Sequence, residues 1–262
     1  MNNSDRNWNR LFGEYTTDET AWYGEWNTYS PDRKLIKSKQ VIRSFRSNAD
    51  NTAITHTNRY IGADGNVEET TWQIDRATCN QPDGVSHPAA SSMRTLAFEA
   101  GALAFLSQKL ASGNACGVEL FFRDREWRTS IAIIYGENGH LSHITQIREH
   151  LESFSAQLLS LESSEFSGDW IGKQRAMTCD LSISPEEEIQ LSFDKITDSH
   201  QIVSFPSNMI AMFAKSVDVD RPIQLAVGQR TADHQLQYLA AHYAADGAFS
   251  RLVSATLHLE SV

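Results

Sequence analysis

Short stretches of alternating apolar and polar residues run along almost the whole chain. Alternation with a period of two is typical of half-buried β-strands, and Gly, Pro, Asn and Asp residues separate the stretches as turns do. In the first half the expected strands are 21–30, 33–46, 52–62, 66–76, 92–99, 101–107, 116–125, 127–136 and 140–149. In the second half they are 169–182, 187–194, 200–206, 208–215, 222–230, 235–244 and 249–260. The pattern predicts an all-β protein of antiparallel strands.

Two segments have helical spacing instead, with apolar residues three and four positions apart. These residues are Trp8, Leu11 and Phe12 in the first segment and Leu151, Phe154, Leu158 and Leu161 in the second. We expect a short helix before each of two barrels, with the first helix closing one barrel end.

Residues 77–91 lack any periodicity and contain several Pro, Gly, Asn and Ser residues. They predict a long surface loop. Long loops in compact domains are often functional lids, and a tolerated insertion is the alternative.

A Gly-acid-Trp triplet occurs twice, as Gly24-Glu25-Trp26 and as Gly168-Asp169-Trp170. Each triplet follows a helical segment and opens a run of strands. The Gly allows a sharp turn, and the Trp ring two residues later can fill the floor of a barrel. We therefore expect Trp26 and Trp170 to be equivalent core residues and not ligand contacts.

The two halves also end on similar hairpins. Tyr135 precedes an Asn-Gly turn in the first, and Tyr243 precedes an Asp-Gly turn in the second. Two matched landmarks in the same order indicate a tandem duplication. We expect one antiparallel barrel with a ligand cavity over 1–150, and a smaller one with the linker helix over 151–262.

Composition narrows the classes of partner. The chain has 262 residues, of which 40% are hydrophobic, so it can bury a sizeable core. A net charge of −10 argues against nucleic acid and anionic membranes as partners. Neither a secretion signal nor an apolar span is visible, and we expect a cytoplasmic protein without membrane insertion. The oligomeric state is left open.

The three cysteines, Cys79, Cys116 and Cys179, are an odd and widely spaced set. They fit reduced thiols, and no Cys or His spacing predicts a zinc site. We expect no metal and no cofactor.

Several short motifs together resemble a known family. They are Gly24-x-Trp26 after a short helix, Tyr29-Ser30-Pro31-Asp32, Thr57-Asn58-Arg59-Tyr60, Phe98-Glu99-Ala100-Gly101, Gly117 to Phe122, Arg128 to Tyr135, and Ile147-Arg148-Glu149. The chain is similar to an uncharacterised family of tandem lipocalin-like (calycin) proteins known chiefly from photosynthetic bacteria. The resemblance implies the fold, and no catalytic residues. Relatives that are distant in fold include bilin lyases, and other calycin folds include cyclases.

Candidate site residues come from polar positions within apolar strands of the first half. If one face of 54–61 and one face of 118–123 line the barrel, an aromatic cavity with a few polar anchors results. The opposite assignment would turn these residues to solvent, and the pattern leaves both open. On the first assignment the catalytic candidates are His56 and Glu119, and the ligand-binding candidates are Tyr23, Asn58, Tyr60, Trp72, Phe121, Arg128 and Tyr135.

Arginines near the barrel floor have two interpretations. Arg43, Arg128 and Arg148 could each stack on a Trp ring, which is a structural role, or hold a carboxylate. Glu119 and Glu149 could pair with them, and a buried pair of this kind would mark a site.

The sequence contains no phosphate loop, nucleophile elbow or metal-ligand cluster. The first hypothesis is an enzyme that binds a small apolar or amphipathic molecule and promotes its isomerisation or cyclisation by shape and hydrogen bonding. The second is a non-catalytic carrier of a pigment or lipid-like ligand. A third, a bilin lyase or chromophore chaperone, follows from fold analogy alone.

Overall fold

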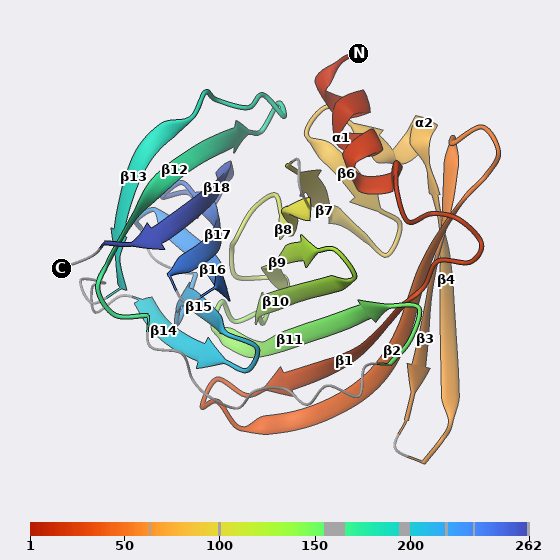
Figure 1. The fold of residues 1–262 in the computed structure, drawn as a ribbon, viewed down its shortest axis with the longest axis horizontal. Helices are drawn as coiled ribbons and strands as arrows, with labels where there is room; N and C mark the ends of the chain where they lie inside the picture. The colour runs from red at the N-terminus through yellow and green to blue at the C-terminus, as the bar shows by residue number, and fades with distance from the viewer. Residues whose placement is uncertain are drawn as a thin grey trace.

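The computed structural model describes residues 1–62, 64–98, 101–154, 166–193, 200–217, 220–232 and 234–260. Within these ranges the chain forms two antiparallel β-sheets and two short helices (Figure 1). The prediction of an all-β chain is confirmed.

The first sheet has 11 strands in the order β4-β3-β2-β1-β11-β10-β9-β8-β7-β6-β5. Their bounds are β1 Trp22–Tyr29, β2 Leu35–Ser47, β3 Ala53–Ile61, β4 Val67–Asp75, β5 Asn80–Gln81, β6 Gly84–His87, β7 Ala90–Ala97, β8 Leu103–Ser107, β9 Cys116–Asp124, β10 Trp127–Tyr135 and β11 Leu141–Leu151. Neighbours in sequence pair as hairpins, and β1 pairs with β11. The two edge strands, β4 and β5, are joined by one helical turn, α2 (Arg76–Cys79), so the sheet coils into a nearly closed barrel.

The second sheet has seven strands in the order β13-β12-β18-β17-β16-β15-β14. Their bounds are β12 Asp169–Thr178, β13 Glu187–Ser192, β14 His200–Phe205, β15 Met209–Ala214, β16 Ile223–Ala232, β17 Gln235–Tyr243 and β18 Phe249–Leu259. Its first strand pairs with its last, as in the first sheet. It has no counterpart of β3 to β6 among the described residues, which accounts for its smaller size.

The N-terminal helix, α1 (Asn3–Phe12), starts where the Asn2 side chain accepts a hydrogen bond from the Asp5 backbone N–H and ends at Gly13. Trp8 and Phe12 are buried in a cluster with residues of β3, β4, α2 and β6. The helix therefore covers one end of the barrel. In the second helical segment, Leu151 ends β11 and residues 155–165 lie outside the described part of the chain.

The prediction of a loop over 77–91 is wrong. This segment contains most of α2, all of β5 and β6, and the start of β7. Asp75 caps α2 by accepting from the Ala77 backbone N–H. Strands of two and four residues are too short for an alternating pattern to show, and their Gly and Pro neighbours read as turns.

The strand register shows which residues of the two halves are equivalent, and it differs from the expected alignment. Trp22 stands opposite Leu151 at the end of β11, and Trp170 stands opposite Leu259 at the end of β18. Trp170 is therefore equivalent to Trp22, and the expected equivalence with Trp26 is wrong. The shared motif is Trp-x-Gly, because each Trp is followed two residues later by a Gly.

Both of these glycines lie against a neighbouring backbone. A Cβ atom on Gly24 would come within 2.5 Å of the Arg148 carbonyl oxygen, and one on Gly172 within 2.1 Å of the Thr256 carbonyl oxygen. Glycine is needed at these two positions because a side chain would not fit there, and not because the backbone adopts a conformation that only glycine allows.

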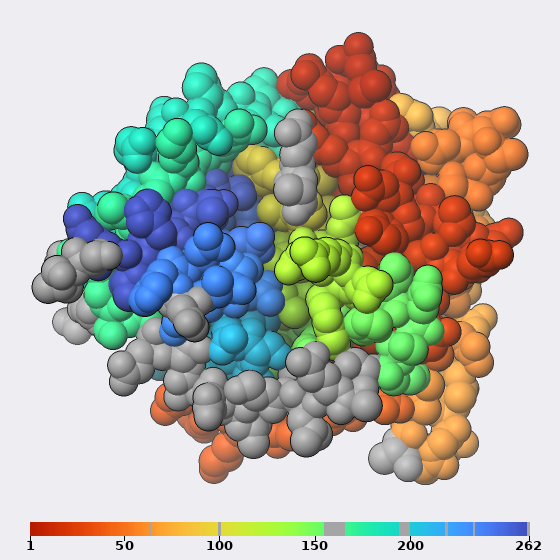
Figure 2. All heavy atoms as spheres, in the orientation of Figure 1, coloured from red at the N-terminus to blue at the C-terminus, as the bar shows by residue number. Residues whose placement is uncertain are grey.

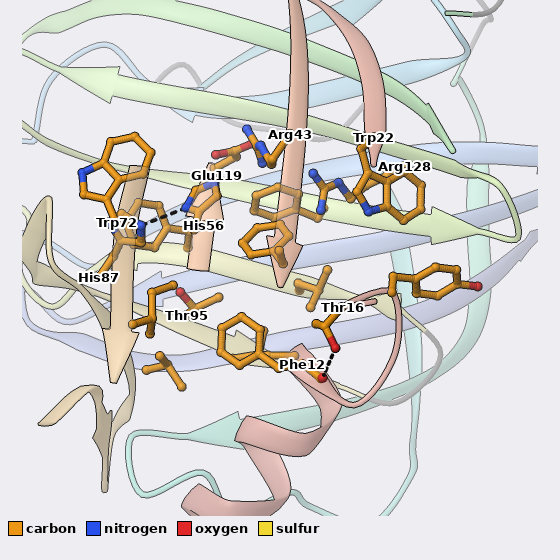
Figure 3. A pocket seen from close by; sticks show the side chains of 18 of the residues that line it. Phe12, Thr16, Trp22, Arg43, His56, Trp72, His87, Thr95, Glu119 and Arg128 are labelled. Carbon is orange, nitrogen blue, oxygen red and sulfur yellow. Dashed lines mark hydrogen bonds between the residues drawn. The ribbon is translucent and has the colours of Figure 1, made fainter. Parts of the chain in front are cut away.

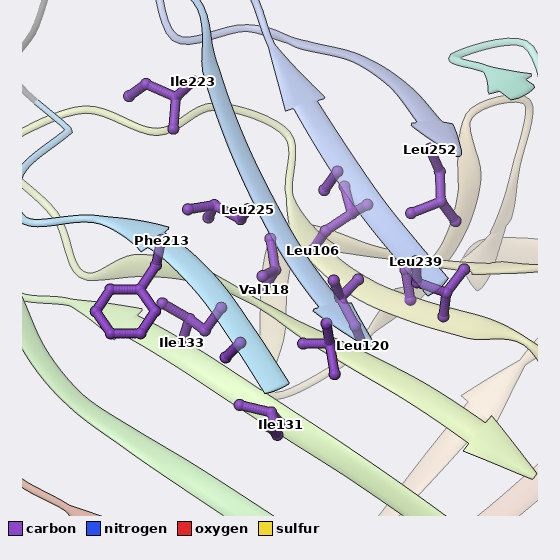
Figure 4. Packing of buried hydrophobic residues seen from close by; sticks show 14 of the residues in the cluster. Leu106, Val118, Leu120, Ile131, Ile133, Phe213, Ile223, Leu225, Leu239 and Leu252 are labelled. Carbon is purple, nitrogen blue, oxygen red and sulfur yellow. The ribbon is translucent and has the colours of Figure 1, made fainter. Parts of the chain in front are cut away.

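The two sheets pack face to face through one large apolar cluster (Figure 4). Leu106, Val118 and Ile133 of the first sheet meet Leu225 and Leu239 of the second in it. Figure 2 shows the second sheet, in cyan and blue, against the middle strands of the first. The boundary between the sheets falls after β11, whereas the division into domains 1–150 and 151–262 stays a prediction.

Candidate functional site

A cavity of about 320 Å³ lies inside the first sheet, next to the C-terminal end of α1 (Figure 3). Strands β8 to β10 each contribute residues of one face to this cavity and pack the other face on the second sheet. The aromatic wall is formed by Phe12, Trp22, Phe45, Trp72, Phe105 and Phe121. The cavity is therefore apolar over much of its surface.

Glu149 is the centre of a buried group of charges at the cavity wall. Its side chain is 0% exposed. Arg128 donates from Nε to Glu149 Oε2 at 2.6 Å and also forms an ion pair with it through Nη2. Arg43 Nε lies 3.5 Å from Oε1, and Trp26 Nε1 donates to the same oxygen at 3.3 Å. Both carboxylate oxygens are thus occupied.

The strand register creates this arrangement. Glu149 stands directly opposite Arg128 on β10 and opposite Gly24 on β1. A Cβ atom on Gly24 would lie 2.3 Å from Glu149 Cγ, so the glycine leaves the space that the carboxylate side chain fills. Trp22 stands opposite Arg43 on β2, which brings the second guanidinium to the same face.

Each arginine is also stacked on aromatic rings. The Arg43 guanidinium lies 4.6 Å from the centre of the Trp26 ring, and that of Arg128 lies 4.9 Å from the centre of the Trp22 ring. Such stacking holds the guanidinium planes in fixed orientations. The structural and the ligand-holding interpretations of these arginines are therefore compatible.

The two carboxyl groups of the site behave differently. Burial alone would raise the pKa of Glu149, but Arg128 and Arg43 beside it hold that pKa below its usual value. Burial raises the pKa of Glu119, even though Arg43 and a hydrogen bond from Ser130 Oγ at 2.7 Å oppose the shift. Glu119 lines the cavity. It is thus the carboxyl group that can retain a proton next to a bound molecule.

A chain of hydrogen bonds runs along the same wall. His56 Nδ1 lies 3.0 Å from His87 Nε2, and His56 Nε2 lies 3.1 Å from Asn58 Oδ1. Asn58 Nδ2 donates to the Tyr60 hydroxyl at 3.1 Å. The Ala89 backbone N–H donates to His87 Nδ1 at 3.1 Å.

These contacts fix the tautomers. Because His87 Nδ1 accepts, a neutral His87 bears its hydrogen on Nε2 and donates to His56. His56 then bears its hydrogen on Nε2 and donates to Asn58. All the donors point the same way, from Ala89 toward Tyr60, and no member of the chain needs a charge.

Burial, with Arg43 and His87 nearby, lowers the pKa of His56 to about 2. Burial and Arg43 also lower the pKa of His87. His56 therefore stays neutral at physiological pH and cannot act as an imidazolium acid. It orients its neighbours by hydrogen bonding and stacks on Phe45 at 4.4 Å between ring centres.

Six of the nine expected site residues line the cavity, and three do not. The six are His56, Asn58, Trp72, Glu119, Phe121 and Arg128. Tyr60 ends the hydrogen-bond chain outside the lining. Tyr23 lies on the outer face of β1, where its ring contacts Phe154, because Trp22 and Gly24 occupy the inner face. Tyr135 is buried against the second sheet, and its hydroxyl donates to the Ala214 carbonyl at 2.8 Å.

Sequence reasoning missed His87, Phe12 and Trp22 as cavity residues. His87 belongs to the segment expected as a loop. The Gly-acid-Trp triplet indicates Trp26 and not Trp22. Trp26 also lines the cavity, so the expectation that it is only a core residue is wrong. The alternation in 21–30 already places Trp22 and Trp26 on one face.

No metal site is evident in the parts of the chain that the structure describes, where no group of three His, Cys, Asp or Glu side chains could hold an ion. None of the described helices has the length and apolarity needed to cross a membrane.

Comparison with solved structures shows which proteins share this fold. A protein of unknown function from the DUF3598 family of Nostoc punctiforme superposes with a TM-score of 0.72 at 18% identity, covering 97% of this chain and 99% of that one. A Nitrosomonas europaea structure provisionally assigned as AttH gives a TM-score of 0.26 at 8% identity, covering 91% and 92% of the two chains. The first match shows a shared fold, and the second is too weak to support any argument. No curated protein matches the chain.

A family model described as the N-terminal domain of unknown function DUF3598 matches residues 4–154. This range contains α1 except its first residue, the whole first sheet, and all the residues that line the cavity. The lipocalin-like character of the family stays a prediction. Because the matched range is more than half of the sequence, the chain belongs to the DUF3598 family.

Proposed function

We propose that this protein binds a small apolar or amphipathic molecule in the cavity of the first sheet. The observation that supports this most strongly is the combination of an aromatic wall with a few fixed polar groups on one side. Small-molecule sites have this composition, and a volume of about 320 Å³ lies at the lower end of their usual range of roughly 300–1,000 Å³. The ligand is therefore expected to be compact or slender.

The polar groups of the cavity are preorganised for binding. Stacking and ion pairing hold Arg43 and Arg128, and the neutral hydrogen-bond chain holds His56 and Asn58. A preorganised site loses little conformational entropy on binding. This favours a specific ligand over nonspecific apolar filling.

The test uses an uncharged probe, N-phenyl-1-naphthylamine, whose fluorescence rises in apolar surroundings. Leu103→Trp introduces a larger side chain at the cavity wall, and Leu35→Trp places the same residue on the surface, where Leu35 is 57% exposed. We expect saturable binding to the wild type and to Leu35→Trp, and at least tenfold weaker binding to Leu103→Trp, about 1.4 kcal/mol. Thermal melts establish that both variants fold. Equal binding by all three proteins would refute the cavity as the site.

A catalytic role, the isomerisation or cyclisation of the bound molecule, is favoured by the position of Glu119. Its protonated carboxyl could donate a proton to a carbon–carbon double bond, the resulting cation could rearrange beside Trp72 and Phe121, and loss of a proton back to the carboxylate would complete an isomerisation. The atoms balance without any cofactor. Aromatic ring faces stabilise cations that lie close to them.

Catalysis is tested with the molecule that co-purifies from the native host, identified by native mass spectrometry. Glu119→Gln should retain binding and lose turnover by at least roughly a hundredfold, the usual range for general acids. Loss of binding together with turnover would indicate a structural role, and full turnover would exclude Glu119 as the acid. A carrier would show binding and no turnover in either protein.

A further inference from the structure

We propose that the ligand is an amphipathic carboxylic acid, whose carboxylate is bound between Arg43 and Arg128 while its apolar part follows the aromatic wall. This inference rests on the proposed function and specifies the ligand class of the same cavity.

Arg43 has unused hydrogen-bonding capacity in a buried place. Its side chain is 8% exposed, and its nearest carboxylate contact, Nε to Glu149 Oε1, is 3.5 Å long. Buried Nε has no hydrogen-bond acceptor within the described residues. A guanidinium offers five N–H donors in a planar fork, and the Trp26 ring holds that plane in place. The group thus lines the cavity while its Nε has only an ion-pair contact, and no hydrogen bond, with Glu149.

Arg128 is paired with Glu149 through two of its nitrogens. Its Nε donates to Glu149 Oε2 at 2.6 Å, and its buried Nη2 forms an ion pair with the same oxygen without hydrogen-bond geometry. Glu149 cannot accept a further hydrogen bond, because Trp26 and Arg43 already contact Oε1 and Arg128 occupies Oε2.

The balance of charge indicates an anion. Two buried guanidinium groups face one ion-paired carboxylate, that of Glu149. The two histidines of the neighbouring hydrogen-bond chain, His56 and His87, are neutral. Of the two acids that line the cavity, Glu14 is paired with Arg123 at 3.0 Å, and burial raises the pKa of Glu119. A buried charge without a counter-charge is costly. One bound carboxylate would match the second guanidinium.

A carboxylate also fits the geometry of the donors. Its planar pair of oxygens matches the guanidinium fork, and both Arg43 and Arg128 line the cavity. Phe12, Phe45, Trp72 and Phe105 leave an apolar route for the rest of the molecule. The ligand class is therefore a monocarboxylic acid with an apolar body.

The experiment measures displacement of N-phenyl-1-naphthylamine by decanoic acid and by decan-1-ol, which share the same chain length. With wild-type protein at neutral pH, the acid should displace the probe at a concentration at least tenfold lower than the alcohol. Arg43→Gln should bring the two concentrations within about threefold of each other. Arg59→Gln removes a guanidinium on the outer face of β3, paired with Glu69 at 3.3 Å, and should leave the tenfold difference unchanged.

Equal displacement by acid and alcohol on the wild-type protein would overturn the inference while leaving the cavity as a binding site. That ratio is available even if Arg43→Gln fails to fold. A folded Arg43→Gln that keeps the full acid preference would also overturn it. Failure of the probe to bind wild type at all would instead contradict the proposed function.

Discussion

Glu149 shows how one buried carboxylate can organise a site. Its neighbours across both strands, Arg128 and Gly24, are fixed by register, so the ion pair and the space for it are set by the same pairing. The sequence suggested that Glu149 could pair with an arginine, and the structure shows pairs with Arg43 and Arg128. It suggested a turn at Gly24, whereas the structure shows a close approach. A single sequence cannot separate these two uses of glycine, since both follow from the missing Cβ.

Gly24→Ala tests the space argument. The new methyl group would meet both Glu149 Cγ at 2.3 Å and the Arg148 carbonyl oxygen at 2.5 Å, and the backbone atom cannot yield. We expect a loss of about 1–3 kcal/mol in the free energy of unfolding, measured by urea denaturation. Gly136→Ala, whose nearest contact is the flexible Asn138 side chain at 3.2 Å, should change it by no more than about 0.5 kcal/mol. Similar losses in both variants would count against the close approach.

His56 makes stability depend on pH. Its pKa is about 2 in the folded protein, mainly because the ring is buried and also because Arg43, His87 and Arg128 are nearby, and 6.5 is the ordinary value expected on unfolding. Below pH 6.5 the unfolded chain binds a proton that the folded chain does not, so the free energy of unfolding falls as pH falls.

Between pH 7 and pH 5 this loss is about 2 kcal/mol for one such group. His56→Gln should therefore lose about 2 kcal/mol less than wild type over that interval, measured by urea unfolding at both pH values. Parallel pH profiles would show that His56 titrates normally in the folded protein.

At the scale of elements, long strands were predictable and short ones were not. The expected bounds of β1 to β4 and β7 to β11 lie close to the observed ones, because each strand is long enough to show alternation. By contrast, α2, β5 and β6 have four, two and four residues. Their positions depend on packing against α1 and β7, which is information that a local pattern does not contain. The cavity residue His87 was missed for this reason.

Trp8→Ala tests the role of α1 as the cover of the cavity. Trp8 is fully buried and packs edge-on against Phe12 at 4.8 Å between ring centres. Removing such a ring should cost about 3–5 kcal/mol and, because Phe12 and Leu11 line the cavity, should also weaken binding of N-phenyl-1-naphthylamine. Trp127→Ala, at a half-buried ring stacked on Arg148 outside the cavity, should cost less and leave probe binding intact. A stable Trp8→Ala protein would show that the helix is not held by this residue.

At the scale of the whole molecule, each sheet donates a tyrosine hydrogen bond to the other. The Tyr135 hydroxyl donates to the carbonyl of Ala214 at the end of β15, and the Tyr243 hydroxyl donates to that of Ser107 at the end of β8. The turns after these tyrosines also pair with the other sheet, through the bridges Lys109–Ala248 and His140–Ser216. The sequence revealed the repeated hairpins but not this exchange, because alternation identifies a buried face without identifying what covers it. The expectation that Tyr135 binds ligand failed on this point.

Replacing either tyrosine with phenylalanine should weaken the whole molecule. Each change removes one hydrogen bond and leaves a buried carbonyl without its donor, which costs about 1–3 kcal/mol. We expect Tyr135→Phe and Tyr243→Phe to lower the urea midpoint by similar amounts. Because the sheets share one core, tryptophan fluorescence and far-ultraviolet circular dichroism should still report a single transition with an unchanged slope. Tyr23→Phe, on the outer face of β1, is the control and should shift stability by no more than about 0.5 kcal/mol. Two separate transitions in the wild type would mean that the sheets are independent folding units.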